Sequence, residues 1–146
     1  MRRMVPIRLR RGQRGQSLIE TAIMMLVIVT VFFWVFELCW LMYTYSVIAD
    51  AANEGVRYAI VHSGGDSAGT QSRVSAFAAA TMHDVSALST TVDFSADGGT
   101  TYSTSGSATP PNIVRVKVTY AYIPFLPRFI GSPTMHAYAQ GTMVVQ

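Results

Sequence analysis

The pattern of apolar and polar positions divides the chain into a long apolar segment followed by a more polar part. Residues 21–36 are uncharged and nearly all apolar, Glu37 interrupts them, and residues 38–49 are uncharged again. As a helix, residues 18–43 would be about 39 Å long, which exceeds a bilayer hydrocarbon core of about 30 Å. We therefore expect one membrane-spanning helix over about residues 18–43.

The helical pattern continues beyond the apolar segment. Apolar residues recur at spacings of three to four positions from Val47 to Ile60, and no proline interrupts residues 8–108. We expect one helix from about Ser17 to Val61, whose first half lies in lipid and whose amphipathic second half packs against another part of the chain. Residues 63–66, Ser-Gly-Gly-Asp, are expected to end this helix.

The helix is expected to remain in the mature protein as an anchor. Ala49-Asp50-Ala51 has the small residues of a signal-peptidase site. The apolar run before it is, however, about twice as long as the apolar region of a secretory signal. Conventional signal cleavage is therefore disfavoured.

The second part of the chain is expected to form a short helix and an antiparallel sheet. Apolar residues at loosely helical spacing predict a helix within residues 74–88, and residues 91–95 have strand-forming composition. Asp97-Gly98-Gly99 predicts a turn, after which residues 100–103 are expected to return as a partner strand. The predicted fold class is α+β, a long N-terminal transmembrane helix that continues into a small C-terminal antiparallel sheet domain.

The best strand pattern covers residues 113–120. Here Val114, Val116, Val118 and Tyr120 alternate with Arg115, Lys117 and Thr119, which predicts one buried and one exposed face. A loop rich in Ser, Thr, Gly and Pro precedes it at residues 103–111, and residues 134–146 predict a last strand. Between these strands, residues 123–133 form an apolar segment with three prolines, for which two interpretations stay open. It is a lid over the core, or it is an exposed patch for a partner or the membrane surface.

Charge is segregated along the chain and limits the possible partners. Of 11 basic residues, six arginines lie within the first fifteen positions, where there is no acid; residues 16–146 hold the other five and all eight acids, a net charge of −3. A nucleic-acid interface needs bases clustered on a folded surface, so no nucleic acid is expected as a partner. The arginines fit the positive-inside rule, with the N-terminus in the cytoplasm and the C-terminal part exported.

No arrangement of residues predicts catalysis, a cofactor or a metal. His62, His83 and His136 are isolated, and neither an HExxH nor a CxxC motif occurs. Gly64-Gly65 and Gly98-Gly99 fit turns rather than phosphate-binding loops. The single cysteine, Cys39, is expected to act as a small apolar side chain in the helix.

Two carboxylates in the apolar helix need an explanation. A carboxylate near the middle of a bilayer costs on the order of 3 kcal/mol on insertion scales. Either Glu20 extends to the cytoplasmic edge and Glu37 to the outer interface, or each meets a partner such as a cation on another subunit. Both interpretations stay open on these grounds alone.

The junction between the basic leader and the apolar helix has a recognisable form. It reads Arg14-Gly15-Gln16-Ser17-Leu18-Ile19-Glu20, with a glycine before the apolar run and a glutamate five residues later. This arrangement resembles the signals of type IV prepilin-like proteins. The resemblance implies that a membrane-embedded aspartyl peptidase cuts between Gly15 and Gln16, and that the apolar helix is retained for assembly. It also implies that Glu20 pairs with the new N-terminal amine of a neighbouring subunit.

Two further blocks extend the resemblance, Glu37-Leu38 and Ala51-Ala52-Asn53-Glu54-Gly55-Val56-Arg57-Tyr58-Ala59. With the leader, they match in order the motifs of the TadE-like family of pseudopilins, from the tight-adherence branch of type IV pilus systems. The resemblance covers about the first 60 residues, and the remainder is similar only in broad pattern. Many members have a proline soon after the first glutamate, whereas this chain has Ile23-Met24-Met25-Leu26, so we expect no kink there.

The block around Glu54 has physical properties of its own. Glu54 and Arg57 stand three residues apart, which predicts an ion pair on one helix face. Gly55 lets another backbone approach closely, or it prepares the end of the helix. The alternatives are an ordinary solvated pair and a helix-weakening glycine, or a packing motif, together with Tyr58, against the C-terminal sheet or a partner.

The resemblance implies a minor pilin or pseudopilin that is assembled in, or primes, a cell-envelope filament or secretion apparatus. The expected organisation is a cytoplasmic leader over residues 1–15, the long helix over residues 16–62 and an exported domain over residues 63–146. Expected partners are other pilin subunits, a prepilin peptidase, an assembly platform in the bacterial inner membrane and the lipid bilayer. One alternative is an uncleaved single-pass scaffold protein with an exported binding domain, for which Gly15 and Glu20 would be dispensable. A membrane-bound enzyme is disfavoured because no set of acid, base and nucleophile is visible.

Overall fold

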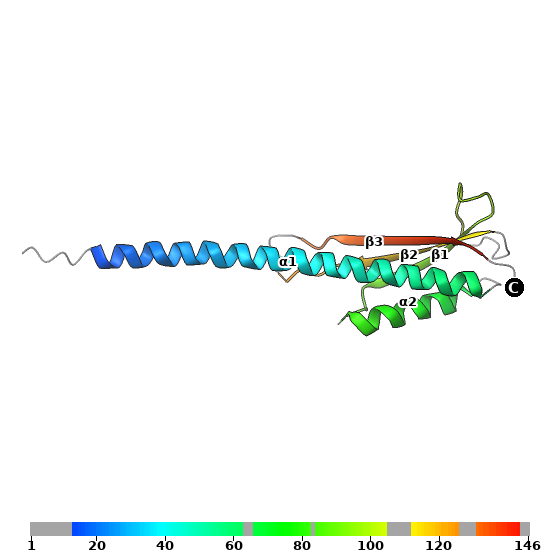
Figure 1. Cartoon of the computed structure of the whole chain (residues 1–146), viewed down its shortest axis with the longest axis horizontal. Coiled ribbons are helices and arrows are strands. Elements are labelled where there is room, and N and C mark those ends of the chain that lie inside the picture. Colours follow the sequence, from blue (N-terminus) through cyan, green and yellow to red (C-terminus); the bar gives the residue numbers. More distant parts are fainter. Residues whose placement is uncertain (1–12, 63–65, 83, 105–111, 126–130, 144–146) are drawn as a thin grey trace, which may run out of the picture. The chain divides into compact units, whose positions relative to one another are not determined.

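The computed structural model describes residues 13–62, 66–82, 84–104, 112–125 and 131–143. In chain order, the elements are α1 (Gln13–Val61), α2 (Ser67–Thr81), β1 (Leu88–Ser95), β2 (Ile113–Ala121) and β3 (Thr134–Thr142) (Figure 1). The predicted α+β class is confirmed. The chain forms two compact units, Met1–Leu38 and Cys39–Gln146.

The first unit contains the apolar half of α1. The helix begins four residues before the predicted start and ends at the predicted Val61. Large apolar side chains are exposed on every side of it, among them Leu18, Phe32 and Phe36. Within the described residues, one helix is long and apolar enough to cross a membrane, over Gly15–Val61. A helix that is apolar all round is typical of a lipid-embedded segment.

Two threonine side chains of this apolar half form hydrogen bonds within the helix. The hydroxyl of Thr21 donates to the carbonyl of Ser17 at 2.9 Å, and the hydroxyl of Thr30 donates to the carbonyl of Leu26 at 2.8 Å. Both hydroxyl groups would therefore keep a hydrogen-bond acceptor inside a bilayer, whose hydrocarbon core offers none.

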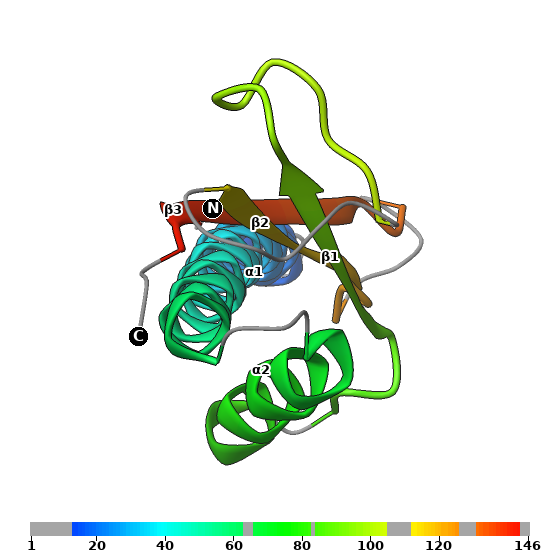
Figure 2. The same cartoon turned by 90° about the vertical axis from the view of Figure 1, so that its right-hand side faces the viewer.

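The second unit is a two-layer arrangement of helices on a sheet. The three strands pair antiparallel in the order β1-β2-β3, so β2 is central. Figure 2 shows α2 and the second half of α1 on the same side of this sheet. The other side of the sheet carries no helix among the described residues of this unit.

The alternation predicted for the central strand is confirmed. Val114, Val116 and Val118 are fully buried and Tyr120 nearly so, all on the side that faces the helices. They pack with residues of both helices and of the other strands, including Ile48, Ala51, Ala52, Val56, Ala59, Val74, Ala78, Val92, Phe94 and Ala137. The second half of α1 buries mainly small residues, which allows the helix axis to lie close to the sheet.

The second helix was predicted too late in the sequence. It spans Ser67–Thr81 rather than lying within residues 74–88, and Val85 and Leu88 follow it. Asp66, which was expected to end the first helix, is instead the N-cap of α2, where its side chain accepts from the N–H of Gly69 at 2.8 Å. Capping by a short carboxylate fixed the helix start, and apolar spacing alone missed it.

The partner strand expected at residues 100–103 is also wrong. β1 pairs along its whole length with β2, and Ser103 makes only an isolated bridge to Phe94. Asp97 explains the difference, since it accepts from the backbone N–H groups of Thr100 and Thr101 at 3.0 and 2.9 Å. These N–H groups are then unavailable to a strand ladder. The expected turn at residues 97–99 is present, and both glycines there have positive φ angles of 74° and 94°.

The segment leading back to β3 is described only at its ends. Ile123 and Phe125 are exposed, so neither side chain acts as a lid over the core, whereas Pro124 is buried. The remainder of the predicted apolar segment includes residues 126–130, which lie outside the described residues. The same holds for most of the loop predicted at 103–111 and for residues 144–146 of the predicted last strand.

Asp97 provides a test of the turn in solution. Hydrogen bonds from the hydroxyl of Ser95 and from the N–H and hydroxyl of Thr101 hold the pKa of the Asp97 carboxyl well below its usual range. Because this pKa is lower than the value of about 3.9 in an unfolded chain, its stabilising contribution is complete above that pH. The contribution is lost only as the pH falls through the lower value of the folded chain.

We expect the carboxyl carbon of Asp97, followed by NMR in detergent micelles, to report an ionised group at about pH 3. Thr101→Val removes one donor and is expected to raise the titration midpoint. A midpoint near the unfolded value in the unmodified chain would contradict the hydrogen-bonded turn.

Candidate functional site

The predicted processing site lies in the first turn of α1. Gly15 and Gln16 follow the helix start at Gln13, and both are exposed. No atom lies within 4 Å of the position that a Cβ on Gly15 would take. The first turn of a helix has N–H groups without intrahelical partners and frays easily.

Glu20 stands one turn further along and is exposed between apolar side chains. Leu18 and Ile19 before it and Ile23 after it are also more than half exposed. In lipid, a carboxylate in these surroundings is stable only if it is neutralised or meets a cation. The exposure of Glu20 is compatible with both sequence-based interpretations, extension to the cytoplasmic edge and contact with a cation of another subunit.

Glu37 has different surroundings from Glu20. Its side chain is 3% exposed, and it is one of four buried polar or charged residues identified in the described chain. Glu20 remains the carboxylate that this part of α1 displays.

In the second unit, the block around Glu54 lies where α1, α2 and the sheet meet. The predicted ion pair between Glu54 and Arg57 is not the one formed. Glu54 instead accepts from Arg73 of α2, whose Nη2 and Nε lie 2.9 and 3.1 Å from the same carboxylate oxygen. The pairing joins two helices rather than two turns of one helix, because α2 packs beside this face of α1.

Gly55 is buried where α1 lies close to both α2 and the central strand β2. A Cβ built on it would lie 2.5 Å from Cγ2 of Val74 in α2 and 3.2 Å from Cγ1 of Val116 in β2. Any side chain at position 55 would therefore push against α2 and the central strand. The glycine is required for close packing here, and it does not mark the end of the helix.

Tyr58 connects α1 to the start of α2. Its hydroxyl donates to Oδ2 of Asp66 at 3.2 Å, and its ring stacks on that of His62 with centroids 3.9 Å apart. Partial desolvation, followed by the hydrogen bond to Asp66 and the charge of that residue, raises the pKa of Tyr58. Since Asp66 also caps α2, this hydrogen bond couples the end of one helix to the start of the next.

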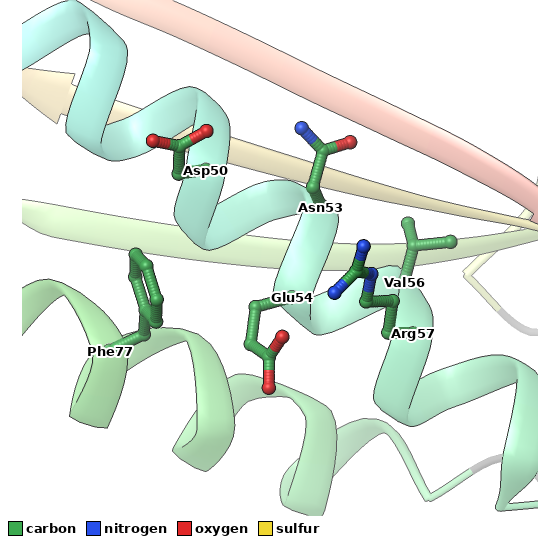
Figure 3. A pocket seen from close by; sticks show the side chains of 6 residues that line it. All are labelled: Asp50, Asn53, Glu54, Val56, Arg57 and Phe77. Carbon is green, nitrogen blue, oxygen red and sulfur yellow. The ribbon is translucent and has the colours of Figure 1, made fainter.

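Arg57 lies at an open hollow of about 410 Å³ beside the motif. Figure 3 shows its lining, with Asp50, Asn53, Glu54, Val56 and Arg57 on α1 and Phe77 on α2. The hollow carries both signs of charge and no nucleophile next to a base. Its chemistry suits a polar contact with another protein surface better than catalysis.

Each of the two histidines that the structure describes contacts a neighbouring side chain of the fold. His62 stacks on Tyr58, and Nδ1 of His136 lies 3.2 Å from the hydroxyl of Thr119 on the neighbouring strand. His83 lies outside the described residues. Among the residues that the structure describes, no group of three or more His, Cys, Asp or Glu side chains is arranged to hold a metal.

Three residues of this region were missed at the sequence level. Arg73 is the partner of Glu54, Asp66 is shared by Tyr58 and the α2 cap, and Gly141 of β3 faces α1. A Cβ on Gly141 would lie 2.8 Å from Cγ1 of Val56 and 3.2 Å from Cγ2 of Ile60. An isolated glycine inside a strand pattern is a signal of close backbone approach, and it could have identified Gly141.

The substitution Gly55→Ala tests whether close packing requires a glycine at position 55. Alanine favours the helix by about 1 kcal/mol, whereas overpacking a buried site costs about 1–3 kcal/mol. The stiff valine at position 74 is fully buried and has little room to move. We therefore expect a lower melting temperature for the full chain in detergent micelles. Asn53→Ala, at an exposed position of the same helix, is the control and is expected to change stability little; equal melting temperatures of the two variants would refute the packing role.

Comparison with known proteins assigns a family resemblance to the N-terminal part of the chain. Residues 15–57 match the family model described as TadE-like protein. Comparisons with curated proteins and with solved structures gave no significant match. The matched segment starts at Gly15 and ends at Arg57, so it contains Glu20, Glu37, Glu54 and Gly55. The TadE-like family suggests a structural, pilus-associated protein of Tad systems rather than an enzyme. The resemblance to TadE-like proteins that the motifs predicted is thus confirmed over residues 15–57.

Proposed function

We propose that this chain is a minor pilin or pseudopilin that contributes to assembly or priming of a Tad-type pilus or secretion apparatus. The proposal rests on the overlap between the segment that matches the TadE-like family and two structural features of α1. The segment that matches the TadE-like family includes the exposed apolar half of α1 and Gly55, which lets its second half pack closely on α2 and the sheet. An exposed apolar helix joined to a small folded domain suits a subunit that moves from lipid into a helical bundle.

The proposed organisation has three parts. Residues 1–15 form a basic leader in the cytoplasm, residues 16–62 form the long helix, and residues 63–146 complete the exported domain. The six leader arginines support this orientation in the bacterial inner membrane through the positive-inside rule. The second half of α1 is packed into the exported unit, whose compact region begins at Cys39.

Assembly in this proposal begins with cleavage between Gly15 and Gln16 by a prepilin peptidase. The cut removes the leader charges and creates an amine at Gln16, so that Glu20 becomes the fifth residue of the cleaved chain. Glu20 of one subunit then meets the N-terminal amine of a neighbour, and each charge removes the cost of leaving the other unpaired in an apolar bundle. The exposed apolar side chains of α1 provide the remaining contact with other pilin subunits and with the assembly platform.

The motif of Glu54, Gly55, Arg57 and Tyr58 has a separate role in the proposal. Gly55 packs against α2 and the sheet, and Glu54 and Tyr58 bond to Arg73 and Asp66. These contacts hold the exported unit on its helix, so that force applied to the helix moves the folded domain with it. Arg57 is left at the surface for contacts between subunits.

Glu20→Gln tests the ionic part of the proposal. The variant is expected to insert into the membrane normally, because it removes a charge from lipid, and to be cleaved after Gly15. It is expected to lose at least about tenfold in co-purification with other pilus components, since the amine of the neighbour is left unpaired. The measurement is affinity capture of the tagged chain from detergent-extracted membranes of its host.

Thr21→Val is the matched control, because it removes a neighbouring polar group whose hydroxyl is already bonded to the carbonyl of Ser17. It is expected to co-purify like the unmodified chain. Normal co-purification of Glu20→Gln would contradict the pairing and favour the alternative function, an uncleaved single-pass scaffold with an exported binding domain.

A further inference from the structure

Two large apolar side chains project from the exported unit directly after β2. Ile123 and Phe125 are 65% and 79% exposed, whereas Tyr122 and Pro124 beside them are buried. Phe125 is the most exposed large apolar residue in the part of the chain that the structure describes. The buried side chains of Tyr122 and Pro124 attach this segment to the folded unit, whereas the side chains of Ile123 and Phe125 point outward.

The base of this segment is held in place. The N–H of Tyr122 donates to the carbonyl of Pro133 at 3.1 Å, which closes the connection between β2 and β3. Pro124 fixes its own backbone angle and is buried. Little conformational entropy is therefore lost when Ile123 and Phe125 enter a new environment.

The position of Ile123 relates this segment to the end of the apolar run in α1. Ile123 lines a hollow of about 230 Å³ together with Trp40 and Tyr43, and Tyr43 also donates to the carbonyl of Thr81 at 3.4 Å. Aromatic residues gather toward the far end of the apolar run, as they would in an aromatic belt at the outer membrane–water interface: Trp34, Trp40, Tyr43 and Tyr45. Ile123 and the residues next to it therefore lie at the level of that belt.

The chemistry of the surroundings suits an interface with lipid. The described lining of the hollow consists of aromatic, apolar and hydroxyl side chains, and Asp84 is its one charged residue. Tryptophan and tyrosine rings prefer the headgroup region, where apolar side chains beside them can reach the acyl chains. A partner recognised through charge would find few groups to pair with here.

We propose that Ile123 and Phe125 insert into the exported-side interface of the same bilayer that α1 spans. The subunit then has two contacts with lipid, the apolar half of α1 and the side chains of Ile123 and Phe125. The inference rests on the membrane-spanning role of α1 in the proposed function. Ile123 and Phe125 must then leave the lipid when a subunit enters a filament.

The test measures the depth of single labels in the full chain. In a Cys39→Ser background, Ile123→Cys and Phe125→Cys are each labelled with an environment-sensitive nitrobenzoxadiazole dye. The proteins are placed in vesicles of phosphatidylethanolamine and phosphatidylglycerol, some of whose lipids carry a nitroxide quencher near the headgroup. Because both positions are exposed, their replacement leaves the core unchanged.

Tyr138→Cys is the matched control, since Tyr138 is 72% exposed but lies on the strand face that no described helix of this unit covers. Groups inserted about 5–10 Å into the interface contact the quencher, so we expect quenching at positions 123 and 125 at least about threefold stronger than at 138. Equal quenching at 125 and 138 would overturn the proposal. Shielding at 125 that appears only when other pilus components are present would overturn it in favour of a protein contact.

Flotation of the same vesicles separates this inference from the proposed function. A chain that floats with the lipid but shows no depth difference refutes the loop contact alone. A chain that does not float refutes the membrane-spanning helix, and with it both proposals.

Discussion

The fold depends on one constraint, the close approach of the second half of α1 to the sheet and to α2. This approach is possible because the buried face of α1 carries alanines and Gly55, and because Gly141 of β3 leaves room for Val56 and Ile60. Dispersion energy falls steeply with distance, so small residues that bring backbones together allow many weak contacts to add. The polar contacts of Glu54 and Tyr58 with α2 lie at the margin of this apolar packing and fix its orientation.

The same helix has a different task in its first half. There its apolar side chains remain exposed, and Glu20 is displayed among them. A soluble protein would not tolerate such a surface, whereas a subunit that exchanges lipid for the helices of neighbours requires it. One continuous helix thus combines a buried attachment to the second unit with an exposed apolar surface, which the proposed function uses for assembly. The match to the TadE-like family covers most of the length of this helix.

Much of this arrangement was predictable because it follows from periodicity. The apolar run predicted α1, and strict alternation predicted the buried face of β2 with Val114, Val116 and Val118.

The errors arose where one side chain overrides the local pattern. Asp66 caps α2 and so moves that helix towards the N-terminus, and Asp97 binds the N–H groups that a strand at residues 100–103 would need. The partner of Glu54 was missed because Arg73 is 19 residues away in the sequence, and only the packing of α2 brings it near. Gly15, Glu20 and their roles come from the family resemblance, and they remain proposals.

The most direct measurement of the central claim is the mass and N-terminal sequence of the chain from the membrane fraction of its host. The account predicts a mature protein that begins at Gln16, because a prepilin-type peptidase cuts after Gly15 and leaves α1 in place. A chain that still begins at Met1 would contradict it and leave a plain membrane-anchored scaffold. A chain that begins at Ala52 would mean that the apolar half of α1 is a discarded signal.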